Sequence, residues 1–300
     1  MADSYNASNA TYRRKIKAQS IIRFIVCVII TIICLLPIYI ILINSTRDSA
    51  DIIKSGISFL PGTSFIDNFK NLTDPNYANG VYDRTFNLLV GYRNSLIISV
   101  STTILTVFFS ALTAYGLTVY DFKGKKIATT FILMVMMVPT QVVSTGFLEF
   151  MASINLLNNY IPLILPAIAA PATVFFMLQY MKSSFPLDIV EAARIDGSGE
   201  FRTFMTIALP IFKPAFAVQA IFAFVANWNN FYTPSMLLVN GDRNMRTMPM
   251  MVGGIMGLST TIDYGIQNLA VILSILPIVV VYLCLSKFII KGVALGAVKG

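Results

Sequence analysis

The sequence predicts an all-α integral membrane protein with six transmembrane helices, and three observations lead to this prediction. Hydrophobic residues make up 56% of the 300-residue chain and charged residues only 12%, whereas a soluble protein has roughly a quarter charged residues. Uncharged stretches of about 20 residues, the length that crosses ~30 Å of hydrocarbon, occur six times. These stretches are continuously apolar rather than alternating, which favours helices over a β-barrel.

The predicted spans divide the chain into three parts. They cover residues 24–43, 95–119, 127–148, 160–181, 215–238 and 266–286. We expect a cytoplasmic N-terminal segment at 1–23, a six-span domain at 24–290 and a cytoplasmic tail at 291–300. The first span is interpreted as a retained helix rather than a signal peptide, because a polar segment precedes it and no small-residue cleavage site follows it.

The distribution of lysine and arginine predicts the orientation in the membrane. If the N-terminus is cytoplasmic, most of the 22 basic residues fall on the inner side, as the positive-inside rule requires. The short loop predicted at 149–159 on the outer side then carries no basic residue. Both termini are therefore expected in the cytoplasm. The net charge of +8 is interpreted as a topology signal and not as a nucleic-acid surface.

Several functions are excluded by what the sequence lacks. It has no histidine and no phosphate-binding loop of the form GxxxxGK[ST], so it is not expected to hydrolyse ATP by the usual machinery. No acidic residue lies in the predicted spans, which argues against a self-powered secondary transporter. An intramembrane hydrolase would need a base at depth, and none is available. A channel, a scaffold or a translocation subunit driven by a partner remains.

Polar residues within the spans are candidates for a solute pathway. Amides and hydroxyls can replace water around a sugar, and aromatic faces can stack on its ring. The candidates are Tyr115, Thr140, Gln141, Asn227, Trp228, Asn229 and Asn230. The alternative for each is a hydrogen bond between helices or an anchor at the membrane interface.

The polar segment 186–210, between the fourth and fifth predicted spans, predicts a short helix, a turn and a second helix. Pro186 suits a first helical turn, and Asp188 and Glu191 place negative charge near the helix N-terminus. Ala192 and Ala193 are expected to form an exposed ridge of small residues. Gly197 is expected to end this helix in the left-handed conformation.

Ser198 is expected to cap the second helix of this segment. Phe201, Phe204, Met205 and Ala208 follow a helical spacing and predict an apolar face, which Leu209-Pro210 would terminate. Two interpretations of the helix pair stay open on physical grounds. It either packs beneath its own bundle or docks into a cytoplasmic partner.

A family resemblance decides between them. Glu191-Ala192-Ala193, three residues, Gly197, nine residues, Ile207, one residue and Leu209-Pro210 resembles the EAA loop of permease subunits in binding-protein-dependent ABC importers. Further motifs resemble the carbohydrate-uptake branch, similar to the smaller maltose-type permease. They are Asn94-Ser-Leu, Ala114-Tyr115, Asp196-Gly197, Trp228-Asn229 and the ending 292–300. One departure is Thr118-Val119, where the family often has Ala-Arg.

The resemblance implies the ABC importer permease fold, with a cytoplasmic coupling helix between the fourth and fifth spans. Residues implied to contact a separate ATPase dimer are Glu191, Ala192, Ala193, Asp196, Gly197, Leu209 and Pro210, with Lys299 and Gly300 in the tail. The chain would be a non-catalytic subunit of a bacterial inner-membrane importer. ATP and Mg²⁺ would be bound by the partner, so no catalytic, cofactor or metal residue is assigned to this chain.

The implied partners are a second homologous permease, an extracellular solute-binding protein, an oligosaccharide and membrane lipids. Two alternatives stay open. One is an ABC permease for another solute, such as a polyol or glycerol phosphate. The other is a stand-alone channel or membrane scaffold.

Overall fold

A computed structural model describes residues 2–74, 86–239, 243–256 and 263–297, and it describes their side chains except at 2–15, 140–141 and 288–297. All secondary-structure elements in these ranges are helical, which confirms the predicted all-α class. The longest helices are α1 (Ala2–Asn44), α4 (Leu88–Val119), α8 (Pro171–Ser184), α12 (Lys213–Trp228) and α15 (Tyr264–Ala297).

Shorter helices connect these long ones. They are α2 (Ser49–Ser55), α3 (Phe65–Thr73), α5 (Lys125–Met136), α6 (Thr140–Ser153), α7 (Ile161–Ile164), η1 (Leu165–Ile168), α9 (Asp188–Ile195), α10 (Glu200–Thr203), η2 (Phe204–Ala208), α11 (Leu209–Ile211), α13 (Tyr232–Leu237), η3 (Arg243–Met245) and α14 (Met248–Met256). The elements η1 and η3 are 3₁₀-helical and η2 is a π-helical turn.

Within the described ranges, four helical segments are long and apolar enough to cross a membrane: Ile16–Asn44, Leu88–Val119, Ile161–Ser184 and Tyr264–Lys287. A fifth is obtained if the pair Glu200–Ile211 and Lys213–Trp228, which is bent by 81°, is counted as one span. The structure therefore has the apolar helices of a multi-pass membrane protein.

Three of the predicted spans are interrupted in the structure. The stretch 160–181 divides into α7, η1 and α8, although Ile161–Ser184 still forms one apolar segment long enough to cross a membrane. The stretch 127–148 divides into α5 and α6, with Pro139 in extended backbone between them. Proline lacks an N–H and disfavours helical backbone at the residue before it, so the break at 137–139 has a local cause. The stretch 215–238 divides into α12, which ends at Trp228, and α13, at whose start the side chain of Asn230 accepts a hydrogen bond from the N–H of Thr233.

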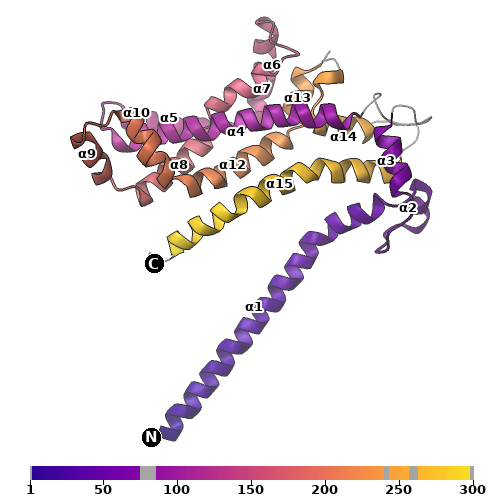
Figure 1. Cartoon of the computed structure of the whole chain (residues 1–300), viewed down its shortest axis with the longest axis horizontal. Coiled ribbons are helices and arrows are strands. Elements are labelled where there is room, and N and C mark those ends of the chain that lie inside the picture. The colour runs from indigo at the N-terminus through magenta and orange to yellow at the C-terminus, as the bar shows by residue number, and fades with distance from the viewer. Residues whose placement is uncertain (1, 75–85, 240–242, 257–262, 298–300) are drawn as a thin grey trace.

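Helix α4 is the central element of the bundle and packs against α8 and α12, while α15 packs against α12 and α1 (Figure 1). The short helices α9 and α10 lie at one end of this bundle, on the same side as the N-terminal end of α1 and the C-terminal end of α15. Helices α2 and α3 lie at the opposite end. The apolar part of α1 is not buried by the rest of this chain.

The buried residues form two separate apolar clusters, one toward each end of the bundle. The first joins α4, α8, α9 and η2, with Met177, Met181, Phe204 and Phe212 at its centre. The second joins α12, α14 and α15. Helices α4 and α12 pack against each other and carry residues of both clusters, so they connect the two ends of the bundle.

Candidate coupling surface at the end of the bundle

Helix α9 forms the outermost part of the bundle at its end. Its first residue is Asp188 and its N-cap is Leu187. Pro186 therefore precedes the helix and does not lie in its first turn. Asp188 and Glu191 lie in its first turn, where a negative charge is stabilised by the helix dipole. The acidic N-terminus that the sequence predicts is therefore present.

The C-terminus of α9 is closed by Gly197. This residue has a φ of 75°, and its N–H donates to the carbonyl of Arg194 at 3.0 Å. The N–H of Ser198 donates to the carbonyl of Ala193 at 2.9 Å. These two bonds make a Schellman motif, in which glycine is favoured because a side chain would be strained at positive φ. The predicted left-handed end of the helix is confirmed.

The two faces of α9 have different surroundings. Val190 is buried in the first apolar cluster and Ala193 is also buried, whereas Glu191 and Ala192 are exposed. The expectation that both alanines form an exposed ridge is therefore wrong for Ala193, because α9 packs on the bundle through that side.

The outward face of α9 carries one large apolar side chain that the sequence reasoning missed. Ile195 is 86% exposed. It lies two residues after buried Ala193, which places it away from the packed face, and the sequence carried no signal for this because it does not show that Ala193 is buried. Asp196 and Gly197 are also exposed. The surface therefore combines an exposed apolar side chain with the exposed carboxylates of Glu191 and Asp196.

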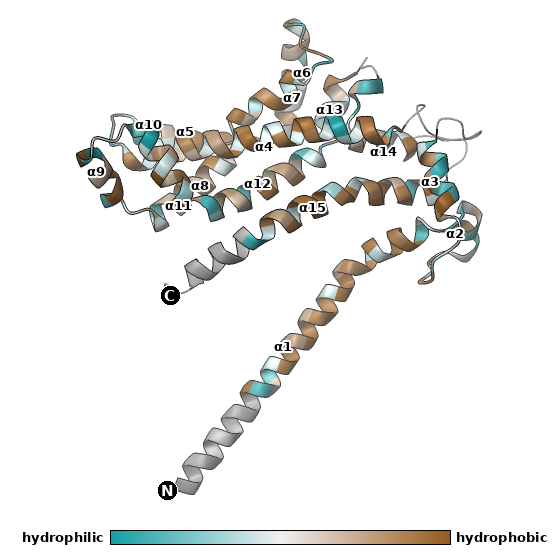
Figure 2. Cartoon of the chain, in the orientation of Figure 1, coloured by the Kyte–Doolittle hydropathy of each residue, from teal (hydrophilic) through white to brown (hydrophobic). Residues whose placement is uncertain are grey.

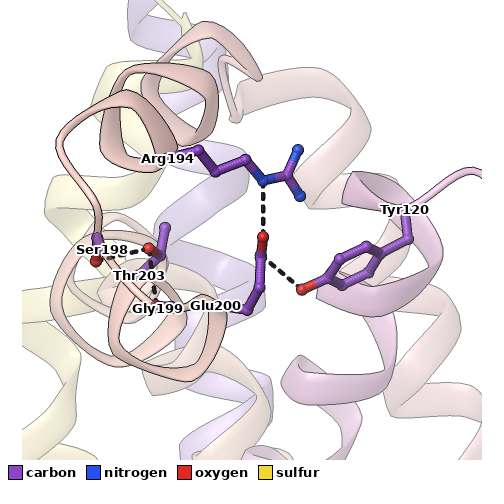
Figure 3. A network of polar contacts seen from close by, with 6 residues as sticks. All are labelled: Tyr120, Arg194, Ser198, Gly199, Glu200 and Thr203. Atoms are coloured by element: carbon purple, nitrogen blue, oxygen red, sulfur yellow. Dashed lines mark hydrogen bonds and ion pairs between the residues drawn. The ribbon is translucent and has the colours of Figure 1, made fainter.

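The second helix of the segment differs from its prediction in its start. Gly199, not Ser198, precedes the first residue of α10, and no side chain caps this helix. The hydroxyl of Ser198 instead lies 3.0 Å from that of buried Thr203. Ser198 is therefore used to close the turn between α9 and α10 (Figure 3).

The apolar face and the end of this second helix also differ. Phe204 and Ala208 are buried, but Phe201 and Met205 are exposed. Pro210 lies inside α11, so the helical path continues to Ile211. The π-helical turn η2 precedes the proline, where a residue without an N–H interrupts the α-helical bonding. The chain then bends by 81° into α12.

Three side chains tie α9 to the end of α4 (Figure 3). The Nε of Arg194 donates to Oε1 of Glu200 at 2.7 Å, and the hydroxyl of Tyr120 donates to Oε2 of the same carboxylate at 2.6 Å. The guanidinium carbon of Arg194 also lies 5.7 Å from the centre of the Tyr120 ring. Tyr120 directly follows α4 and Glu200 begins α10. The Tyr120–Glu200–Arg194 tie therefore joins three elements.

The electrostatics of the tie follow from these contacts. Hydrogen bonds from Arg194 and then from Tyr120 hold the pKa of Glu200 below its ordinary value. Burial, followed by the hydrogen bond to Glu200, raises the pKa of Tyr120 to about 12. Tyr120 is thus a neutral donor and Glu200 a charged acceptor at physiological pH. Because Arg194 and Glu200 are both partly exposed, the tie positions α9 more than it stabilises the fold.

Tyr115 lies beneath this tie. Its ring is buried, 5.2 Å from Phe204 and 6.2 Å from Phe185 between ring centres. Among the described residues, its hydroxyl has no hydrogen-bond partner. Tyr115 was predicted as a pathway residue, and the structure places it in the apolar cluster that supports α9.

The remaining predicted pathway residues are not brought together into one site. Trp228 is fully buried, and its indole N–H donates to the carbonyl of Ser274 at 2.9 Å. The Asn227 amide donates to the carbonyl of Ala223 within its own helix. The side chains of Thr140 and Gln141 lie outside the described residues, as do Lys299 and Gly300.

Asn229 is the pathway candidate that lines a pocket. The pocket has a volume of about 440 Å³ and lies between α12, α14 and α15, with Phe231, Gly253 and Ser274 also in its wall. Its lining is mainly apolar. Asn229 and Ser274 are the side chains there that can offer hydrogen bonds to a polar solute.

Comparison with known proteins gives relatives over almost the whole chain. The chain is 33% identical to the arabinooligosaccharides transport system permease protein AraQ of Bacillus subtilis over 276 residues, covering 90% of this chain and 92% of the relative. It is 32% identical to the trehalose/maltose transport system permease protein MalG of Thermococcus litoralis, covering 94% and 98%. It is 29% identical to the sn-glycerol-3-phosphate transport system permease protein UgpE of Salmonella typhi, covering 87% and 90%.

The fold is similar to a solved structure as well. A chain in the crystal structure of a bacterial ABC transporter involved in the import of the acidic polysaccharide alginate matches with a TM-score of 0.74 at 19% identity, covering 90% of this chain and 96% of that one. The model of the binding-protein-dependent transport system inner membrane component family matches residues 106–295, which include α9, the Tyr120–Glu200–Arg194 tie and α12. The chain therefore belongs to this family of ABC importer permeases, the translocation subunits of binding-protein-dependent transport systems.

Proposed function

We propose that this chain forms half of the translocation pathway of an ABC importer for an oligosaccharide. The relatives named for arabinooligosaccharides and for trehalose/maltose support this solute class, since each aligns with about nine-tenths of the chain. A second permease completes the pathway, a solute-binding protein delivers the sugar, and a separate ATPase dimer binds ATP and Mg²⁺. The chain itself supplies no catalytic residue.

The observation that carries this proposal is the outward face of α9. Ile195 projects from the end of the bundle, Glu191 and Asp196 flank it, and the Schellman end at Gly197 fixes the direction of the helix. In the proposed complex, α9 is the coupling helix and Ile195 enters a groove of the ATPase. Burying one exposed isoleucine contributes roughly 1.5–3 kcal/mol to such an interface.

The Tyr120–Glu200–Arg194 tie connects this coupling helix mechanically to the end of α4. When the ATPase dimer closes and displaces α9, Arg194 draws Glu200, and Glu200 draws the end of α4 through Tyr120. Val190 transmits the same displacement through the first apolar cluster. The spans then alternate between inward-facing and outward-facing arrangements.

The proposed topology has six crossings with both termini in the cytoplasm. α5 and α6 together make the third crossing, interrupted at Pro139, and α12 is the core of the fifth. Single-cysteine variants at Lys123 and Leu156, made in a background without the native cysteines, test this. A membrane-impermeant maleimide applied to intact cells should label the second position and not the first. Equal labelling at both positions would refute a third crossing between them.

Glu191→Lys and Gly197→Asp test the coupling role of α9. Each should abolish substrate-stimulated ATP hydrolysis in the reconstituted transporter while leaving membrane insertion unchanged. Gly199→Asp is the matched control, because this glycine has an ordinary negative φ and precedes α10, where aspartate is favoured. Normal sugar uptake by both test variants would remove α9 from the coupling mechanism.

The solute class is tested with the complete importer in proteoliposomes. Arabinooligosaccharide, maltose, lactose and sn-glycerol 3-phosphate are supplied separately to the cognate binding protein, and ATP-dependent uptake is measured. Uptake of an oligosaccharide alone supports the proposal, and uptake of glycerol phosphate alone replaces it with the second candidate, for which the UgpE relatives are the specific observation. If the chain never co-purifies with an ATPase, the importer proposal fails and the alternative of a stand-alone channel or membrane scaffold is favoured.

Direct contact with the solute is proposed for Asn229, through the pocket that it lines, and for Gln141 and Asn230. Alanine variants of these residues should change the apparent affinity or the rate of uptake. Ser274→Ala is a companion variant in the same pocket as Asn229. Unchanged kinetics in a variant would remove that residue from the pathway.

A further inference from the structure

The start of α14 is hydrogen-bonded to another helix, α4. The side-chain amide of Asn94 donates to the backbone carbonyls of Asn244 and Arg246 at 2.6 and 2.9 Å. The hydroxyl of Ser95 accepts a hydrogen bond at 2.7 Å from the N–H of Met248, the first residue of α14. An N–H in the first turn of a helix has no partner within that helix, so this one needs a partner from outside. Two neighbouring residues of α4 supply all three bonds, and we call them the Asn94–Ser95 clamp.

The clamp lies inside this chain and not on its surface. Asn94 is 0% exposed and Ser95 is 2% exposed. The Nε of Arg93 donates to Oδ1 of Asn94 at 3.2 Å, which leaves the NH₂ group of the amide directed at the two carbonyls. Buried polar groups of this kind are unfavourable without their partners. The position of α14 on α4 is therefore set by this chain itself, whatever a second permease covers.

Close packing accompanies the hydrogen bonds. Met248 and Met251 of α14 are buried, and a Cβ on Gly91 of α4 would lie 3.0 Å from the sulfur of each. The N–H of Asn87, at the N-cap of α4, also donates to the sulfur of Met251 at 3.3 Å. Only a residue without a side chain lets α14 lie so close to α4. The contact therefore leaves α14 little freedom to shift.

Helix α14 forms one wall of the pocket that Asn229 lines. The residues of α14 in this wall are Pro249, Val252, Gly253 and Met256. A Cβ on Gly253 would lie 2.9 Å from the ring of Phe231, which is a further lining residue. The place of α14 thus also determines where this ring can lie. A shift of α14 would change the shape of the pocket.

We propose that Asn94 and Ser95 are positioning residues for the solute pocket. They hold α14 on α4, and α14 presents its side of the pocket to the solute. Neither residue lines the pocket, so both act on the solute through α14. This inference rests on the proposed function, in which the pocket lined by Asn229 contacts the transported solute.

Two variants of the clamp have matched controls. Asn94→Asp replaces a donating amide by a carboxylate that repels both carbonyls, and Ser95→Ala leaves the N–H of Met248 without its partner. Ser99→Ala is the control in α4, because Ser99 is also buried but its hydroxyl has no hydrogen-bond partner among the described residues. Thr247→Val is the control in the segment that leads into α14, for the same reason.

A distance measurement tests whether the clamp holds α14. Spin labels are attached to Leu89→Cys on α4 and Met256→Cys on α14, both exposed, in the full chain within the complete transporter. Cys27, Cys34 and Cys284 are replaced by alanine. Double electron–electron resonance should give one narrow distance in the parent and in both controls, and a broader distribution in both clamp variants. A narrow distribution in the clamp variants would overturn the proposal.

Uptake kinetics test whether the position of α14 matters to the solute. The complete importer in proteoliposomes is supplied with arabinooligosaccharide, maltose, lactose and sn-glycerol 3-phosphate separately. For the solute taken up, the clamp variants should raise the apparent KM roughly tenfold, equivalent to about 1.4 kcal/mol. The maximal rate should stay within about twofold of the parent, because the loss is one of solute binding.

A purely structural role would give a different kinetic result. A lower maximal rate at an unchanged KM would mean that the clamp only keeps the protein folded, and would overturn the proposal. If Asn94→Asp does not assemble into the transporter, the milder Ser95→Ala decides both measurements. If the parent takes up none of the four solutes, the proposed function fails, whereas the distance measurement still decides whether the clamp holds α14.

Discussion

The two ends of the bundle both expose large apolar side chains outside the spans, but they surround them differently. At the α9 end, Ile195 is accompanied by Glu191 and Asp196 on the surface of a helix. At the α2–α3 end, Ile57, Phe59 and Leu60 follow one another closely in a connection without charged residues. The first pattern suits a protein groove that can pair with charges, and the second offers only apolar contacts.

The ends also differ in how they are held. The α9 end is fixed by partly exposed side chains that join separate elements, through the Tyr120–Glu200–Arg194 tie. The α2–α3 end is fixed by buried Arg47, whose guanidinium donates to the carbonyls of Asp51 and Gly56 and to the side chains of Asn44 and Ser55. An exposed tie can shift with its partner, whereas a buried network resists displacement, because leaving a buried polar group unpaired costs about 1–3 kcal/mol. The comparison therefore predicts coupling defects at one end and stability defects at the other.

After Glu191→Lys and Gly197→Asp, which should abolish coupling, the largest expected effect is that of Ile195→Asp. Because Ile195 makes little contact with its own chain, this change should leave thermal stability unchanged. Substrate-stimulated ATP hydrolysis should fall roughly 30-fold, as for the loss of an interface residue worth ~2 kcal/mol. Ile195→Leu is the control and should retain activity. A lower melting temperature with normal coupling would break the distinction between the two ends.

Gly197→Val is expected to reduce coupling by about tenfold, since holding a side chain in the left-handed region costs roughly 1–2 kcal/mol. The φ of 75° at Gly197 is the cause, because no atom crowds the site. Gly199→Val is the control at a negative φ, in equally open space. The ratio of uptake to ATP hydrolysis is the measurement. Equal ratios in the two variants would mean that the end of α9 tolerates a change of direction.

At the opposite end, Gly265→Ala should destabilise the protein without changing the coupling ratio. A Cβ there would clash with two atoms, since it would lie 2.7 Å from the side-chain Nδ2 of Asn68 and closer still to the backbone carbonyl oxygen of Arg47. Overpacking of this kind costs about 1–3 kcal/mol, read as a lower melting temperature. Gly116→Ala in α4 meets no atom within 4 Å and should be neutral or stabilising. A lowered coupling ratio in Gly265→Ala would extend the coupling mechanism to this end.

Glu200→Gln is expected to lower the coupling ratio roughly two- to fivefold, which is less than the effect of Gly197→Val, because exposed ion pairs contribute little. Tyr120→Phe, which removes one hydroxyl, should lower the coupling ratio less. In a double variant the two effects should not add, because both changes break the same tie. Additive effects would show that Tyr120 and Glu200 act separately.

The smallest effect is the dependence on pH. Since the pKa of Glu200 is lowered in the folded protein, its contribution is fully present above the ordinary pKa of a glutamate and is lost as the pH falls through the lowered value. The coupling ratio should therefore stay constant from neutral to mildly acidic pH. Glu200→Gln should show the same flat profile at a lower level. A change in the wild type at the ordinary pKa of a glutamate, absent from Glu200→Gln, would show that Glu200 is not paired in the working transporter.

Much of this molecule could be predicted from residue order. The helical class, the apolar helices and the end of α9 at Gly197 follow from composition and from the conformational freedom of glycine, which are local properties. The motif beginning at Glu191 was enough to indicate the family. The division of 127–148 at Pro139 has an equally local cause, although the continuous hydrophobicity of that stretch concealed it.

Which side of each element is buried was decided only by the tertiary structure. Ala192 and Ala193 have the same side chain, yet one faces outward and the other packs on the bundle. Tyr115 is of a residue type that can contact a sugar, but in the structure its ring packs against Phe185 and Phe204. The hydrophobicity of the sequence determines how much apolar surface must be buried. The bend before α12 and the packing of α9 determine which side chains become buried. Tyr120 and Glu200 are 80 residues apart in the sequence, and nothing in the sequence around either residue indicates that they are in contact.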